Sequence, residues 1–163
     1  MKIQDYTEEL INLRRHFHQH PELALQEVET SAYIRIYLEK LGYTVTAVEP
    51  TGLIAELPCL KKREKLIILR AEMDALPIQE QTGLPYASVN QGCMHACGHD
   101  MILAAALILA KIVAEEQETF PVRMRFLFEP AEEIGEGAKR MIQAGALKDP
   151  RPDAFLMFHY AAD

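Results

Sequence analysis

The stretch Lys65-Leu-Ile-Ile-Leu-Arg-Ala-Glu-Met-Asp-Ala-Leu-Pro77 decides the expected fold. Its apolar run is typical of a strand that is buried on both faces, as strands are in parallel sheets. Acidic residues follow directly, and the carboxyl ends of strands are where open α/β sheets bind their ligands. A simple capping turn is an equally good interpretation of Glu72 and Asp74 when this stretch is taken alone.

Helical and strand-like segments alternate on both sides of this stretch. Apolar residues at helical spacing predict helices over about 7–20, 26–41, 101–116 and 137–144, with Thr7 and Asp100 as N-cap residues of the first and third. Strands are expected over 43–48, 52–57, 65–70, 122–128 and 153–159, with the charged turn Lys61 to Glu64 forming a hairpin. This order predicts an α/β fold with a mainly parallel mixed sheet flanked by helices.

The composition is that of one soluble globular domain spanning residues 1–163, with 49% hydrophobic and 25% charged residues. A net charge of −7 argues against non-specific binding to nucleic acid. The first residues lack the apolar run of a signal peptide, and the longest apolar segment, 101–110, is far short of a membrane span. Three cysteines are an odd number and no disulfide framework, so we expect a cytoplasmic protein.

A second stretch, Gly92-Cys-Met-His-Ala-Cys-Gly-His-Asp100, concentrates side chains that bind transition metals. Three alternatives can be weighed against a metal site. A redox pair of Cys93 and Cys97 has C-x₃-C spacing instead of C-x-x-C, and a structural zinc knuckle needs ligands from two separated turns. A third alternative is a nucleophilic Cys97 activated by a neighbouring histidine. That interpretation would give no role to Glu133 and His159, two further residues of ligand type that follow later strands.

Three expected strands end in acidic or imidazole side chains, namely Asp74, Glu132 with Glu133, and His159. Because parallel strands end at one edge of a sheet, these side chains should meet each other and the Cys97–His99 loop. Cys97, His99, Glu133 and His159 are then candidate ligands for zinc, manganese, cobalt or nickel. Glu132 becomes the candidate general base, although adjacent glutamates are more often merely exposed.

Five motifs, in this order, carry a family resemblance: Arg14-Arg15-x-x-His18-x-x-Pro21-Glu22-Leu23, Met73-Asp-Ala-Leu-Pro-Ile78, Glu80-x-Thr-Gly-Leu-Pro85, Met94-His-Ala-Cys-Gly-His-Asp100 and Phe128-Glu-Pro-Ala-Glu-Glu133. The chain resembles the amidohydrolase branch of the aminoacylase and carboxypeptidase-like metallopeptidases, which includes hippurate hydrolases, indole-acetyl-amino-acid hydrolases and N-acetyl-diaminopimelate deacetylases. The resemblance covers essentially the whole chain.

The resemblance implies a zinc-peptidase-like catalytic domain with two divalent metal ions, zinc or manganese with cobalt and nickel as alternatives. It implies metal-ligand roles for Cys97, His99, Glu133 and His159, with Glu132 as the general base. Asp74 would orient a ligand or tune its basicity, and His95 would support the active site. The implied reaction is hydrolysis of the amide bond of an N-acyl amino acid or small peptide by a metal-activated water.

Two departures from the family pattern bear on these expectations. Members of the family are considerably longer, so we expect an N-terminal portion without the last histidine ligand and without the smaller lid domain that would form a homodimer. Glu72 stands where many members have Asp. Many members also have a further His-Thr shortly after the Gly-His-Asp motif, whereas Asp100 is followed here by Met-Ile-Leu-Ala. We therefore expect weak or no activity from the isolated chain. The alternative is a non-catalytic metal-binding or interaction remnant of such an enzyme.

Overall fold

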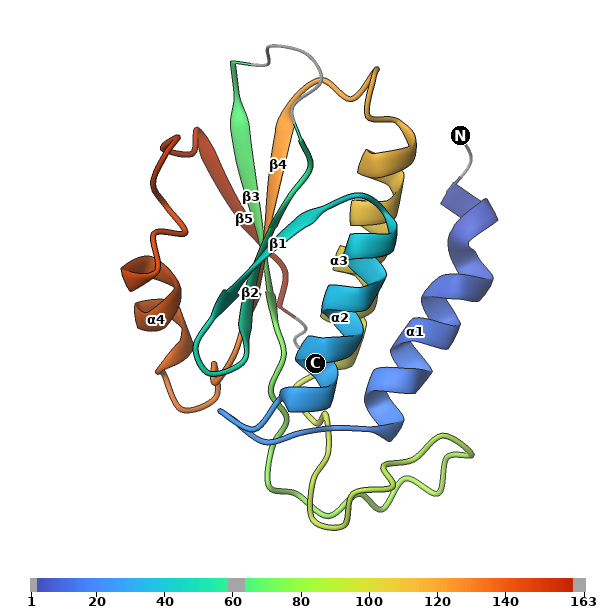
Figure 1. Ribbon diagram of the computed structural model, residues 1–163. Helices are drawn as coiled ribbons and strands as arrows, with labels where there is room; N and C mark the ends of the chain where they lie inside the picture. The colour runs from blue at the N-terminus through green and yellow to red at the C-terminus, as the bar shows by residue number, and fades with distance from the viewer. Residues whose placement is uncertain (1–2, 59–63, 160–163) are drawn as a thin grey trace.

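The computed structural model describes residues 3–58 and 64–159. Helices and strands alternate along this part of the chain (Figure 1). The helices are a short 3₁₀ helix Ile3–Tyr6, α1 Thr7–Gln19, α2 Val28–Lys40, α3 His99–Glu115 and α4 Gly137–Gln143. The strands are β1 Thr44–Val48, β2 Gly52–Glu56, β3 Leu66–Glu72, β4 Arg123–Glu129 and β5 Ala154–Met157. None of the helices in the described ranges is long and apolar enough to span a membrane.

The five strands form one mixed sheet in the order β1-β2-β4-β3-β5. The β1–β2 and β2–β4 pairs are antiparallel, whereas β4–β3 and β3–β5 are parallel. The predicted α/β fold with a mixed sheet is therefore confirmed, with its parallel part confined to β3, β4 and β5. The carboxyl ends of these three strands share one edge, which lies at the bottom of Figure 1.

Helices α1, α2 and α3 cover one face of the sheet, and α4 lies on the other (Figure 1). The larger core lies under the three helices, because α3 is apolar on nearly every side and can be buried between its neighbours and the sheet. Its fully buried members include Phe17, Ile34, Leu38, Leu103, Leu107 and Phe126. A smaller cluster of Val48, Ile68, Leu127, Met141 and Ala146 holds α4 against the opposite face.

Two predicted N-caps are wrong. Thr7 is the first helical residue of α1, and Tyr6 takes the capping position without a side-chain hydrogen bond. Asp100 lies inside the first turn of α3, where Gly98 is the N-cap. The Asp100 carboxylate instead accepts a hydrogen bond from Arg14 and lies 2.9 Å from a ring nitrogen of His18. The Asp100 carboxylate, which the sequence predicts to cap α3, therefore pairs with Arg14 of α1 instead.

The predicted hairpin between β2 and β3 is also wrong, because β4 lies between these two strands in the sheet. β2 pairs with one edge of β4 and β3 pairs with the other, so β2 and β3 are not neighbours in the sheet. Residues 61–63 of the charged turn lie outside the described residues.

Candidate metal centre

Asp74 lies shortly after the end of β3 and connects this strand to the segment that follows β4. The side chain is fully buried, and its two oxygens accept the backbone N–H groups of Glu132 at 3.1 Å and Glu133 at 3.0 Å. Burial alone would raise the pKa of Asp74, but the His99 ring and these two N–H groups outweigh it and lower the pKa. One carboxylate therefore holds the backbone of both candidate glutamates.

His99 is the first residue of α3 and is fully buried. The preceding Gly98 has φ +84°, a left-handed conformation that glycine adopts without strain. Backbone pairing of Leu76 with Met94 draws the loop before α3 against the end of β3. As a result, His99 Nδ1 donates to the backbone carbonyl oxygen of Asp74 at 2.8 Å. The carbonyl of Asp74, more than its carboxylate at 3.6 Å, orients the ring.

Because a carbonyl oxygen only accepts, the hydrogen bond to Asp74 makes Nδ1 the protonated nitrogen and turns Nε2 toward the glutamates. Glu132 Oε2 and Glu133 Oε1 both lie 3.8 Å from His99 Nε2. The distance to His99 therefore does not distinguish Glu132 from Glu133, but the burial and partners of their carboxylates do. Glu133 Oε1 is buried without a partner, whereas the Glu132 side chain is more exposed and lies 3.9 Å from Arg70 Nη2.

Cys97 and His159 also belong to the cluster. Cys97 Sγ lies 3.6 Å from His159 Nε2, and the rings of His99 and His159 are 6.0 Å apart between centroids. Burial and the neighbouring Glu133 raise the pKa of the Cys97 thiol to about 11, so a cation would have to displace its proton. Burial and Glu133 also help to raise the pKa of Glu132, against the opposing effect of His99.

These side chains fit a metal ion. Two groups of three, Cys97–His99–His159 and His99–Glu132–Glu133, each offer ligand atoms that lie within 4.8 Å of one another, and the groups share His99. His99 Nε2 and Glu133 Oε1 are buried with no hydrogen-bond partner. Orphaned buried polar atoms are costly, and two that face each other from an imidazole and a carboxylate are what a cation would satisfy.

The ion pairs of Arg70 with Glu72 and Glu129 were missed by the sequence reasoning. Arg70 Nη1 lies 2.7 Å from Glu72 Oε1, and its Nε donates to Glu129. Glu72 is fully buried and lies 3.8 Å from His159 Nδ1. A signal was present, because Arg70 and Glu72 are two residues apart in a strand and must share one face.

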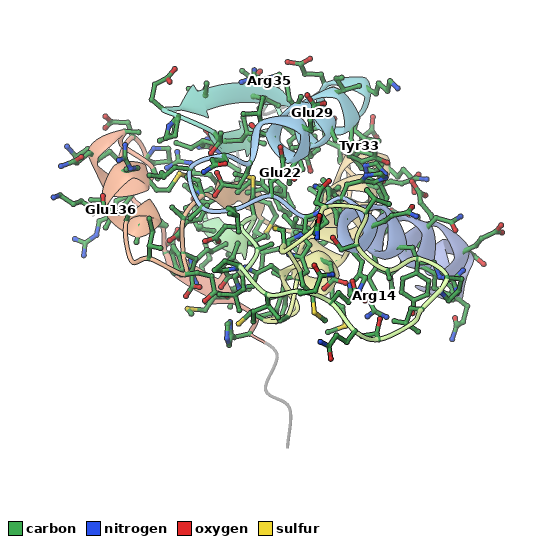
Figure 2. All side chains as sticks on the ribbon, turned by 90° about the horizontal axis from the view of Figure 1, so that it is seen from below. Arg14, Glu22, Glu29, Tyr33, Arg35 and Glu136 are labelled. Carbon is green, nitrogen blue, oxygen red and sulfur yellow. The ribbon has the colours of Figure 1, made fainter. Side chains whose placement is uncertain are left out.

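Two histidines of the sequence motifs lie close to the cluster without joining it. His18 is buried between Asp100 at 2.9 Å and Glu80 at 3.1 Å, beside Arg14. Figure 2 looks onto this edge and shows Arg14 of α1 beside the 79–91 loop. His95 is buried with both ring nitrogens unpartnered, and burial lowers its pKa to about 4.

A mixed α/β sheet with a cysteine, histidine and glutamate cluster at the carboxyl edge of its parallel strands places the chain in the class of α/β proteins with a candidate metal centre. The model of peptidase family M20/M25/M40 matches residues 68–162, and the chain belongs to this family. The family resemblance carried by the sequence motifs is thereby confirmed.

Known relatives agree with this assignment. The chain is 47% identical over 141 residues to an N-acetyl-L-cysteine deacetylase of Bacillus subtilis, covering 85% of this chain and 33% of that protein. It is 44% identical to a probable hydrolase of Synechocystis, covering 85% and 36%. Among solved structures, a Bacillus subtilis dinuclear metal-binding peptidase of the M20 family superposes with a TM-score of 0.90 at 41% identity, covering 99% and 45%. The chain thus spans about a third of the length of these curated relatives.

Proposed function

We propose that the protein containing this chain hydrolyses the amide bond of a small N-acyl amino acid or peptide with the help of two divalent metal ions. The observation that carries the proposal is the pair of buried, unpartnered atoms His99 Nε2 and Glu133 Oε1, 3.8 Å apart at the carboxyl edge of the sheet. Relatives named as N-acetylcysteine deacetylases, and a solved relative that binds two metals, support it.

In this proposal Cys97, His99, Glu133 and His159 hold the metal. Imidazole and thiolate suit zinc, and a carboxylate adds manganese to the candidates. When bound, such ions polarise the amide carbonyl and lower the pKa of a water molecule. Asp74 holds the backbone of Glu132 and Glu133 and, through its carbonyl, the tautomer of His99.

Glu132 is proposed as the general base, because it is the glutamate that remains free to meet water. Its side chain is 28% exposed, and Arg70 lies beside it. The raised pKa of Glu132 makes its carboxylate a better proton acceptor. Glu132 would take a proton from the attacking water and deliver it to the leaving amine nitrogen.

The remaining proposals concern the domain organisation, the location and the activity of the isolated chain, and the first of them rests on the family resemblance. Residues 1–163 would form the N-terminal part of a single catalytic domain. A separate, smaller domain of the whole protein would act as a lid and form the homodimer contact. We propose a cytoplasmic location, because a metal-binding Cys97 has to stay reduced. The isolated chain, which spans about a third of its relatives' length, is expected to be weakly active or inactive.

The test compares Glu132→Gln with Glu136→Gln in the whole protein that contains this chain, using N-acetyl and N-benzoyl amino acids with added zinc or manganese. Glu136 is exposed at the start of α4, and Figure 2 shows it at the periphery of the molecule. Loss of the base should lower kcat by roughly 10²–10⁴-fold with metal content unchanged, whereas the control should keep the wild-type rate. An unchanged kcat for Glu132→Gln would remove Glu132 from the mechanism. Wild-type protein that binds metal but hydrolyses none of these substrates would favour the non-catalytic remnant.

A further inference from the structure

The turn between β4 and α4 carries both candidate glutamates and has a strained backbone. Ala131, immediately before Glu132, has φ +54°. This left-handed conformation is unfavourable for any residue with a Cβ atom and persists only where the surroundings enforce it. Contacts with neighbouring groups must therefore hold Ala131 in this conformation. The same contacts fix the backbone position of the adjacent Glu132.

Three consecutive backbone N–H groups of this turn each donate to a buried carboxylate. Glu132 and Glu133 donate to Asp74, as described above. Ala131 donates to Glu27 Oε1 at 2.8 Å, across 104 residues of sequence. The carbonyl oxygen of Ala131 accepts the N–H groups of Glu136 at 3.1 Å and Gly137 at 3.3 Å. Both backbone polar groups of the strained residue are thus fixed.

Glu27 is completely buried just before α2, and both of its oxygens are used. Its second oxygen accepts a hydrogen bond from the hydroxyl of Thr51 at 2.6 Å, in the turn between β1 and β2. A charged side chain is rarely buried so completely without strong partners, because desolvation is costly. Glu27 does not belong to either group of candidate metal ligands. Its contacts instead connect three segments: the residues before α2, the turn between β1 and β2, and the turn between β4 and α4.

We propose that Glu27 is a positioning residue that holds Ala131 in its left-handed conformation and thereby sets the direction of the Glu132 side chain. The catalytic part of this inference rests on the proposed function, whereas the ordering of the turn does not. Glutamine at position 27 can still accept from Ala131 with its amide oxygen and donate to the Thr51 oxygen. Alanine leaves the Ala131 N–H and the Thr51 hydroxyl without partners.

The first test measures amide hydrogen exchange in the metal-free protein. In Glu27→Ala the amides of residues 131–133 should exchange about tenfold faster or more, while those of β3 keep their wild-type protection. Glu27→Gln should restore slow exchange. Unchanged protection in Glu27→Ala, or acceleration that is equal throughout the sheet, would overturn the proposal.

The second test is kinetic and uses the metal-loaded whole protein that contains this chain. Displacing a reacting group by an ångström costs about 100-fold in rate, so Glu27→Ala should lower kcat by about that factor with KM and metal content nearly unchanged. Glu27→Gln should stay within about threefold of wild type. The matched control is Tyr43→Phe, which removes a different buried hydrogen bond, to the Ala110 carbonyl, and should leave kcat unchanged.

If Glu27→Ala does not fold, Thr51→Val replaces it, because it removes only the second partner of Glu27. It should speed exchange at residues 131–133 by a smaller factor, and unchanged exchange would count against the proposal. Wild-type protein without hydrolytic activity would refute the proposed function, and the exchange measurements would still decide whether Glu27 orders the turn.

Discussion

Replacing Asp74 with asparagine removes the carboxylate that holds the backbone of both candidate glutamates. Asp74 accepts two backbone N–H groups, whereas asparagine offers one acceptor oxygen and turns an NH₂ group toward the other N–H. A hydrogen bond to a charged acceptor contributes about 1.5–3 kcal/mol, and a buried donor left unpaired costs a similar amount. We therefore expect Asp74→Asn to lower the free energy of unfolding by about 3 kcal/mol.

The assay is urea unfolding of the metal-free protein at pH 7, so that metal binding makes no contribution. With an m-value of about 2 kcal/mol/M, the midpoint should fall by about 1.5 M. Asp153→Asn is the matched control, because among the described residues Asp153 accepts one backbone N–H, from Leu66 at 2.8 Å, which an asparagine oxygen can keep. Its midpoint should fall by less than about 0.5 M. Equal shifts for the two variants would refute the role given to Asp74.

Three further predictions concern packing and pH. A Cβ atom at Gly137 would lie 1.8 Å from the Pro130 carbonyl oxygen, so Gly137→Ala should lower the free energy of unfolding by about 1–3 kcal/mol in thermal unfolding. The control is Lys139→Ala on the exposed side of α4, and a loss for Gly137→Ala no larger than that of the control would contradict this prediction. Leu103→Ala, at a fully buried position of α3, should cost about 3 kcal/mol in urea unfolding, and a loss below about 1 kcal/mol would mean that the core repacks around the cavity. Burial raises the pKa of Tyr43 above the ordinary value of 10.0, so its contribution to stability is complete below pH 10 and is lost as the pH rises further. Tyr43→Phe should therefore be less stable than wild type by about 1 kcal/mol at pH 7, and this difference should shrink above pH 10 in unfolding titrations, whereas a constant difference would contradict the pKa shift.

Much of the candidate site could be predicted because its residues follow strands. Asp74, Glu132 with Glu133, and His159 come at or shortly after the ends of β3, β4 and β5, and the hydrophobic runs of these strands are visible in the sequence. Parallel strands end at one edge, so proximity in space follows from topology. Cys97 and His99 join them because the loop before α3 pairs with the segment after β3.

The features that could not be predicted depend on partners far away in the sequence. Asp100 carries the local signature of a helix cap, yet its partners Arg14 and His18 lie more than 80 residues earlier. Glu27 has no local signal at all, because its role comes from Ala131, 104 residues later. Periodicity and capping rules describe a segment and its immediate neighbours, so they miss hydrogen bonds that form only when the sheet brings distant loops together.

We propose that Cys97, His99, Glu133 and His159 hold divalent metal at the carboxyl edge of the sheet. Anomalous diffraction from crystals of the protein grown with zinc or manganese tests it most directly. We expect anomalous peaks about 2.0–2.3 Å from ligand atoms of Cys97, His99, Glu133 and His159, and the loss of the peak at His99 in His99→Ala. An ordered structure without anomalous density there, or with metal only at exposed acidic side chains, would contradict it.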